Sequence, residues 1–166
     1  MARIQGEITV TLSVLDRLID REPNTQVEAP LIRSQSVRLL KNAVRRDLEW
    51  LLNTRRVFQE PDEALKEVNH SLYQFGLPDF SAYSMASAAD HARLLRHLLA
   101  VVKLFEPRLA DVRIIPLENP TKGLQEFRLR LEGMLLMDPV PERVSFDTVI
   151  DVRSGVCRLK GDADAR

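Results

Sequence analysis

The spacing of apolar residues changes at Pro107, and this change constrains the fold more than any other feature of the sequence. Before Pro107, apolar residues recur at three- and four-residue steps, as on one face of an α-helix. After it, they alternate with polar residues, as in strands that bury one face. Helices followed by strands predict an α+β fold. We expect three to four N-terminal helices packed on a C-terminal, mainly antiparallel sheet of about four strands.

Three helical segments precede Pro107. In the first, over 11–21, the spacing places Leu12, Leu15, Leu18 and Ile19 on one apolar face. A weaker helix or turn is expected over 62–72, followed by a rigid corner over 75–80, because that stretch combines a glycine, a proline and large apolar anchors.

The second helix starts at a predicted N-cap, Ser36, and extends to about residue 54. One face is an apolar stripe, and the other carries Arg45, Arg46 and Glu49. Arg45 and Glu49 are four residues apart, a spacing that allows an ion pair. The third helix starts near 87–90 and ends at Glu106, because the residue before a proline disfavours helical geometry.

Four strands are expected after Pro107, over 112–117, 124–134, 144–152 and 156–160. A chain of 166 residues can bury a core large enough to fold without metal or disulfides. We therefore predict a single domain over 1–166, with flexible ends at 1–10 and 161–166.

The charge balance argues against two classes of partner, nucleic acids and anionic membranes. The chain has 24 Lys and Arg against 24 Asp and Glu, so no basic excess favours nucleic acid or an anionic membrane. Of the cations, 19 are Arg and 5 are Lys, and Arg suits carboxylates and protein interfaces. No apolar run is long enough for a membrane span, and the N-terminus does not resemble a secretory signal. A cytoplasmic protein is the expectation.

Residues with catalytic or ligand chemistry are few and scattered. His70, His91 and His97 lack the spacing of a metal site, and the six glycines form no phosphate-binding loop. The single cysteine, Cys157, lies on a late strand and is expected to be a small buried hydrophobe. No carboxylate pair is singled out for glycosidic cleavage. We predict no metal, no cofactor and no catalytic residue.

One local arrangement stands out, at Glu106, Pro107 and Arg108 between the third helix and the first strand. Opposite charges flank a rigid residue, and apolar residues flank the charges. Two interpretations are open. The corner is either a helix terminator with a local ion pair, or a fixed polar handle that a partner binds at low entropic cost.

Five segments carry a family resemblance, and they read SVLDRL at 13–18, RRDLEWLLNTRR at 45–56, FGLPDF at 75–80, FEPRL at 105–109 and VSFDTVID at 144–151. In this order they resemble the TssE class of type VI secretion baseplate subunits, which are relatives of a baseplate wedge protein of contractile-tailed phages with a "lysozyme-like" name.

The resemblance implies a structural, cytoplasmic protein that binds other wedge subunits and helps to initiate the contractile sheath. It favours a partner-binding role for Glu106, Pro107 and Arg108, together with the basic helix that carries Arg45, Arg46 and Glu49. It also implies strand sharing with sheath subunits at a sheet edge, for which Arg128, Arg130 and Asp147 on the later strands are the candidate residues. The alternatives are a peptidoglycan-cleaving enzyme and a small cytoplasmic adaptor.

Overall fold

The architecture matches the expected order of helices and strands. The computed structural model describes residues 10–19, 23–24, 32–57, 59–80, 83–84, 87–117, 126–151 and 153–160. The helices in this part of the chain are α1 (Val14–Leu18), α2 (Arg33–Asn53), α3 (Lys66–Asn69), the 3-10 helix η1 (Leu72–Gln74) and α4 (Ala88–Phe105). The strands are β1 (Leu109–Pro116), β2 (Glu126–Leu135), β3 (Glu142–Asp151) and β4 (Cys157–Lys160).

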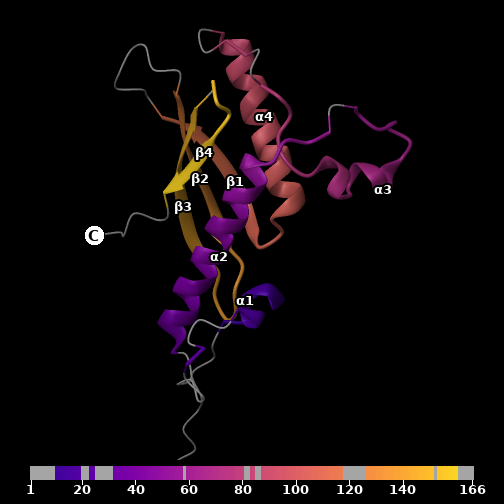
Figure 1. Cartoon of the computed structure of the whole chain (residues 1–166). Coiled ribbons are helices and arrows are strands. Elements are labelled where there is room, and N and C mark those ends of the chain that lie inside the picture. Colours follow the sequence, from indigo (N-terminus) through magenta and orange to yellow (C-terminus); the bar gives the residue numbers. More distant parts are fainter. Residues whose placement is uncertain are drawn as a thin grey trace, which may run out of the picture.

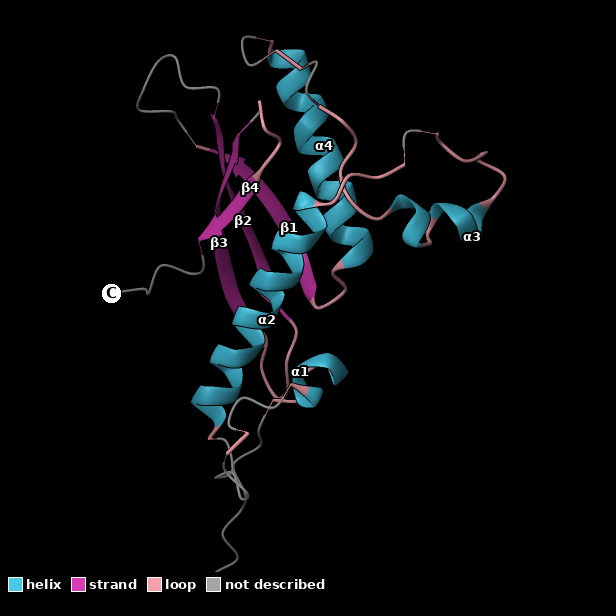
Figure 2. Cartoon of the chain, in the orientation of Figure 1, coloured by secondary structure: helices cyan, strands magenta, loops and turns pink. Residues whose placement is uncertain are grey.

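The four strands form one antiparallel sheet in the order β1-β2-β3-β4. The two long helices, α2 and α4, pack on this sheet, whereas α1 lies at one end and α3 projects away from the body (Figures 1 and 2). The predicted α+β class, the number of helices and the number of strands are all confirmed.

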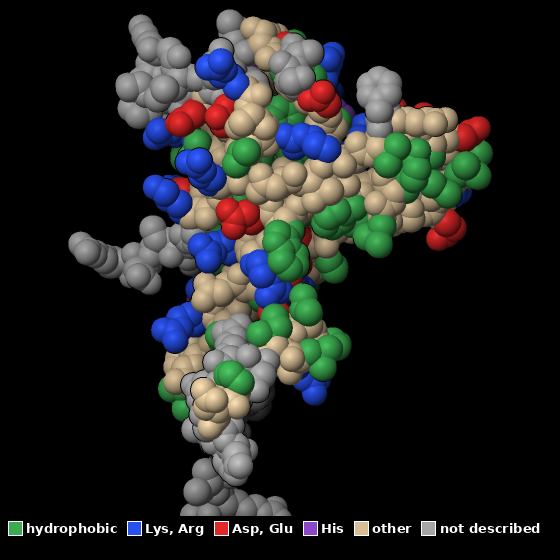
Figure 3. Space-filling view, viewed as in Figure 1, with side chains coloured by type: hydrophobic (Ala, Val, Ile, Leu, Met, Phe, Trp, Pro, Cys, Tyr) green, Lys and Arg blue, Asp and Glu red, His purple; other side chains and the backbone are tan. Residues whose placement is uncertain are grey.

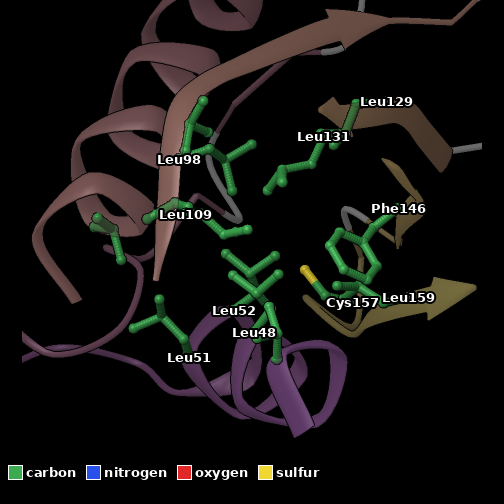
Figure 4. Packing of buried hydrophobic residues seen from close by; sticks show 14 of the residues in the cluster. Leu48, Leu51, Leu52, Leu98, Leu109, Leu129, Leu131, Phe146, Cys157 and Leu159 are labelled. Atoms are coloured by element: carbon green, nitrogen blue, oxygen red, sulfur yellow. The ribbon is translucent and has the colours of Figure 1, made fainter. Parts of the chain in front are cut away.

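The core lies between the sheet and the two long helices. β2 and β3 alternate between buried and partly exposed residues along their length, so one face of each strand contributes to the core. Figure 4 shows these residues meeting side chains from α2 and α4. The labelled residues are Leu48, Leu51, Leu52, Leu98, Leu109, Leu129, Leu131, Phe146, Cys157 and Leu159.

Helix α2 starts earlier than predicted. Its N-cap is Ile32, and Ser36 lies inside the first turns with a fully buried side chain. The Ser36 hydroxyl donates to the carbonyl of Arg33 and accepts the N–H of Val10. The Ser36 hydroxyl is buried and does not cap the helix. It bonds instead to the distant backbone of Val10, and this bond links the N-terminal segment to α2.

Helix α1 differs more from the prediction. It spans only Val14–Leu18, and its one buried residue is Asp16. Leu15, Leu18 and Ile19, which the periodicity placed on one apolar face, are 48%, 77% and 45% exposed. The periodicity was correct for a helix, but ion pairing of Asp16 decides which side faces inward.

The predicted corner at 75–80 is present. Gly76 has a φ of 104°, and a Cβ atom there would lie 2.4 Å from the carbonyl oxygen of Thr54. The next residue, Leu77, is fully buried and donates its N–H to that same carbonyl. Position 76 needs glycine because the backbone at the C-terminal end of α2 lies too close for a side chain.

The sheet order corrects one prediction. Arg128 and Arg130 lie on β2 and Asp147 lies on β3, and both are inner strands. These residues cannot form a sheet edge, because a neighbouring strand lies on each side of β2 and β3. Alternation alone gave no information about strand order. The edge strands are β1 and β4.

Of the predicted flexible ends, residues 1–9 and 161–166 lie outside the described residues, and Val10 is buried against Ser36. None of the described helices has the length and apolar character that crossing a bilayer requires.

Candidate functional site: the Glu-Pro-Arg corner and its charge network

Glu106 occupies the C-cap of α4 and is only 3% exposed. Its backbone N–H donates to the carbonyl of Val102, and its own carbonyl accepts the N–H of Leu109, the first residue of β1. Pro107 between them is exposed. The helix therefore turns into the sheet over two residues, and the turn carries the Glu106 carboxylate inward.

Arg108 satisfies that buried carboxylate. Its Nε and Nη2 atoms donate to the two carboxylate oxygens of Glu106, and Nη2 also donates to Asp47 Oδ2 on α2 at 2.7 Å. The hydrogen bonds with Glu106, followed by that with Asp47, raise the pKa of Arg108 above its ordinary value despite burial. The planar fork of the guanidinium fits this two-sided contact, which a lysine could not make.

Arg46 extends the network along α2. It donates from Nε and Nη2 to Asp47 Oδ1 at 2.9 and 2.8 Å, and from Nη1 to Asp16 Oδ1 at 2.7 Å. Five groups thus alternate in sign, in the order Asp16, Arg46, Asp47, Arg108 and Glu106. We call this set the charge network. It joins α1, α2 and the corner between α4 and β1.

Asp16 is the other buried end of the network. Burial opposes ionisation of its carboxyl group, but hydrogen bonds from the Ser13 hydroxyl and the Arg46 guanidinium outweigh that effect and lower its pKa. The carboxylate is therefore charged in the folded protein at neutral pH, and it holds α1 against α2.

Apolar and aromatic side chains surround the outer side of the network. The Arg46 guanidinium lies 5.2 Å from the ring centroid of Trp50, which is 56% exposed. Leu15 and Leu18 on α1 are exposed as well. Solvent-accessible Trp and Arg side chains are typical of protein interfaces.

A cavity of about 310 Å³ opens beside the corner. It is lined by Val10, Thr11, Leu40, Arg108, Leu136, Met137 and Asp138. Arg108 is thus the residue that the network and this cavity share, and its side chain keeps 27% of its surface exposed.

The structure brings together only part of the predicted site. Arg46 joins the network, but Arg45 and Glu49 do not, and no ion pair connects those two residues in the described part of the chain. The Nε atom of Arg45 is buried without a hydrogen-bond partner. The ion pair that the four-residue spacing allows is therefore absent from the described residues.

Two carboxylates of the network were missed. Asp16 and Asp47 each lie one position from an arginine in the sequence, and Asp16 is not on the apolar face of the helix predicted over 11–21. One sequence feature could have pointed to them: Asp16 and Asp47 each stand next to an arginine, as Asp16-Arg17 and Arg46-Asp47, in segments that resemble a known family. Composition and periodicity do not indicate which charged residues, far apart in the sequence, form ion pairs with one another.

The described residues hold no group of three or more His, Cys, Asp or Glu side chains that could bind a metal. Cys157 is 1% exposed, and burial raises the pKa of its thiol to about 12. At neutral pH this thiol is protonated and packed among apolar residues, as the sequence predicted.

The outer edge of β4 is occupied at Cys157. The N–H of Cys157 donates to Asn53 Oδ1, and the carbonyl of Cys157 accepts from Asn53 Nδ2, each at 2.8 Å. The side-chain amide at the end of α2 thus pairs with one residue of the edge as a neighbouring strand would. At β1 the other edge carries a bulge between Ala110 and Arg113, with Asp111 at a φ of 50°, and ends at Pro116.

Fold and site together define a class of protein: a small α+β domain in which a Glu-Pro-Arg turn between the last helix and the first strand is tied by ion pairs to the other helices. The chain belongs to the family of baseplate wedge protein gp25, whose family model matches residues 38–140. The matched region contains α3, η1, α4, β1, β2 and most of α2, and it includes Arg46, Asp47 and the corner. No curated protein and no solved structure matches the chain. Proteins of this family are structural components of a baseplate.

Proposed function

We propose that this chain is a structural wedge subunit of a type VI secretion baseplate, that it acts in the cytoplasm, and that it binds other wedge subunits through the corner at Glu106, Pro107 and Arg108. The charge network supports this proposal, because it fixes the exposed Pro107 and the partly exposed Arg108 in one geometry. A preorganised surface loses little conformational entropy on binding.

The binding surface that we propose extends from the corner over neighbouring elements. Arg46 and Trp50 contribute on α2, and Leu15 and Leu18 contribute on α1. Arg45 and Glu49 belong to the same helix and remain proposed contacts at its margin. Glu106 acts indirectly in this arrangement, since it is buried and holds Arg108 in place.

The experiment removes both members of the central pair. Glu106→Ala combined with Arg108→Ala takes away two opposite charges at once, so no buried carboxylate loses its only cation while keeping its own charge. We expect the double variant to remain folded by circular dichroism and to lose co-purification with co-expressed wedge subunits. Arg130→Ala combined with Asp147→Ala is the matched control, because it removes another ion pair, 2.7 Å long, on the sheet. Normal co-purification of the corner variant would contradict the proposal.

We also propose that a sheath subunit adds a strand at the edge of β4. The bulge and the terminal proline blunt the edge of β1, because both interrupt regular pairing. On β4, backbone groups of alternate residues face outward, and Asn53 engages those of Cys157. The next outward-facing residue is Leu159, so an added strand starts its hydrogen bonds there.

A lytic activity is not part of the proposal. A glycosidase needs a pair of carboxyl groups that face its substrate, whereas Glu106 and Asp47 are both engaged by hydrogen bonds from Arg108. We expect the purified chain to release no soluble fragments from peptidoglycan. Turnover that a single carboxylate substitution abolished would favour the enzymatic alternative.

A further inference from the structure

The segment between α2 and the corner at 75–80 projects from the body as an ordered arm. We define the arm as residues 59–74, which include α3 and η1 (Figures 1 and 2). The binding surface proposed above does not include this arm. Its side chains from Asp62 to Glu67 are all exposed.

Internal hydrogen bonds give the arm a defined shape. The Tyr73 hydroxyl donates to the carbonyl of Gln59 at 3.0 Å, and Asn69 Nδ2 donates to the carbonyls of Asp62 and Leu65 at 3.0 Å. Arg56 closes the base, since its guanidinium donates to Gln74 at 2.9 Å and to Glu60 at 2.6 Å. A segment with this many bonds to itself presents its side chains in a fixed arrangement.

The exposed surface of the arm is apolar with an acidic border. Leu72 is 80% exposed and Leu65 is 52% exposed, the former being more exposed than any other large apolar side chain in the described residues. Figure 3 shows apolar side chains gathered on this lobe with acidic side chains beside them. Glu63 and Glu67 are exposed, and no ion pair in the described part of the chain engages either of them.

The arm is acidic although the chain is neutral. It carries four carboxylates, those of Glu60, Asp62, Glu63 and Glu67, against one ammonium group, that of Lys66. An acidic surface repels nucleic acid phosphates and anionic lipid headgroups, and these classes of partner are therefore excluded. The leucines would add apolar contact area, and the carboxylates would select a cationic border around it.

We propose that the arm docks on another protein that presents an apolar strip between Lys and Arg side chains, as a basic amphipathic helix does. Leu65 and Leu72 pack on the strip, and Glu63 and Glu67 meet the cations beside it. This inference stands on the arm alone, so it does not depend on the role proposed for the Glu106-Pro107-Arg108 corner.

The test uses the full chain, isotope-labelled for NMR, with two synthetic helical peptides as probes. One peptide carries a leucine stripe flanked by Lys, and the other carries the same stripe flanked by Glu. We expect the basic peptide to shift the resonances of Leu65 and Leu72 in a saturable titration, and the acidic peptide to leave them unchanged. Binding of both peptides with equal affinity, or shifts confined to other surfaces, would overturn the proposal.

Variants separate the apolar contribution from the charge contribution. We expect Leu72→Ala to weaken binding of the basic peptide about fivefold, and Glu63→Lys combined with Glu67→Lys to weaken it about tenfold or more. Val140→Ala is the matched control, because Val140 between β2 and β3 is 65% exposed and lies outside both the arm and the proposed binding surface, and it must leave affinity unchanged. Unchanged affinity of the charge-reversed variant, or an arm-dependent dimer of this chain in sedimentation, would show that the assigned partner is wrong.

Discussion

At the scale of single residues, Arg108 determines whether the corner is stable. It is the direct cation partner of Glu106, a carboxylate with 4% of its side chain exposed. Removing one member of a buried pair leaves the other charge without compensation, which costs more than removing both.

We therefore predict that Arg108→Ala lowers the free energy of unfolding by about 3 kcal/mol, measured by urea denaturation. The double variant Glu106→Ala with Arg108→Ala is the comparison, and it should be more stable than Arg108→Ala alone. Equal stability of the native chain and Arg108→Ala would show that the ion pair contributes nothing to folding.

The lowered pKa of Asp16 predicts that the stability of the fold depends on pH. Its pKa in the folded chain is lowered below the ordinary value of 3.8, so its ion pair contributes fully above that value. As pH falls through the folded pKa, the carboxylate is protonated and the contribution is lost. Between pH 7 and pH 5, Asp16→Asn should be less stable than the native chain.

Below the folded pKa of Asp16 the two proteins should converge in stability. The measurement is urea denaturation at a series of pH values, with Asp151→Asn as the control. The pKa of Asp151 is also lowered, by hydrogen bonds from Ser154 and Arg153 within its own turn, but Asp151 does not connect separate helices. A stability difference for Asp16→Asn that stayed constant over the whole range would contradict the assignment.

At the scale of elements, Asn53 connects the end of α2 to the edge of β4. Both hydrogen bonds to Cys157 come from one side-chain amide, which also donates to the carbonyl of Glu49. We predict that Asn53→Ala lowers the free energy of unfolding by about 2 kcal/mol, because the N–H and carbonyl of Cys157 lose their partner.

Asn53→Asp tests the geometry further. An aspartate can still accept the N–H of Cys157 but cannot donate to its carbonyl, so this variant should also be destabilised. Hydrogen exchange of the Cys157 amide should speed up in Asn53→Ala more than in Asn53→Asp. If both variants exchanged at the native rate, Asn53 would not be the group that protects this edge.

At the scale of the whole molecule, burial is unevenly distributed. The long helices and the sheet share one core, while α1 contributes one buried residue and α3 contributes none. We predict that amides of α1 and α3 exchange with solvent through local opening, and that those of α2 and β2 exchange only near global unfolding. Uniform protection factors across these four elements would contradict this expectation.

The sequence predicted the parts of the fold that depend on local periodicity. The helix end at Glu106 and the alternation along β2 and β3 were read correctly, because a proline and a period of two act over a few residues. The local pattern of opposite charges around a proline located the corner at Glu106 and Arg108, the family resemblance favoured a partner-binding role for it, and the family model covers these residues.

Long-range features could not be read from the sequence in the same way. Arg46 meets Asp16 across 30 residues, and Arg108 meets Asp47 across 61, so no local rule identifies either pair. The placement of β2 and β3 inside the sheet depends on pairing between strands, which alternation does not encode. For α1, a hydrophobic pattern predicted the wrong inner face because a single ion pair outweighed it.

The acidic arm also gives this neutral protein an electric dipole. Residues 59–74 carry a net charge of −3 by formal count, so the remainder of the chain carries the opposite charge. In the field of a charged partner such a molecule rotates toward one orientation before any contact forms. Its association rate should therefore fall as ionic strength rises, while the dissociation rate changes much less.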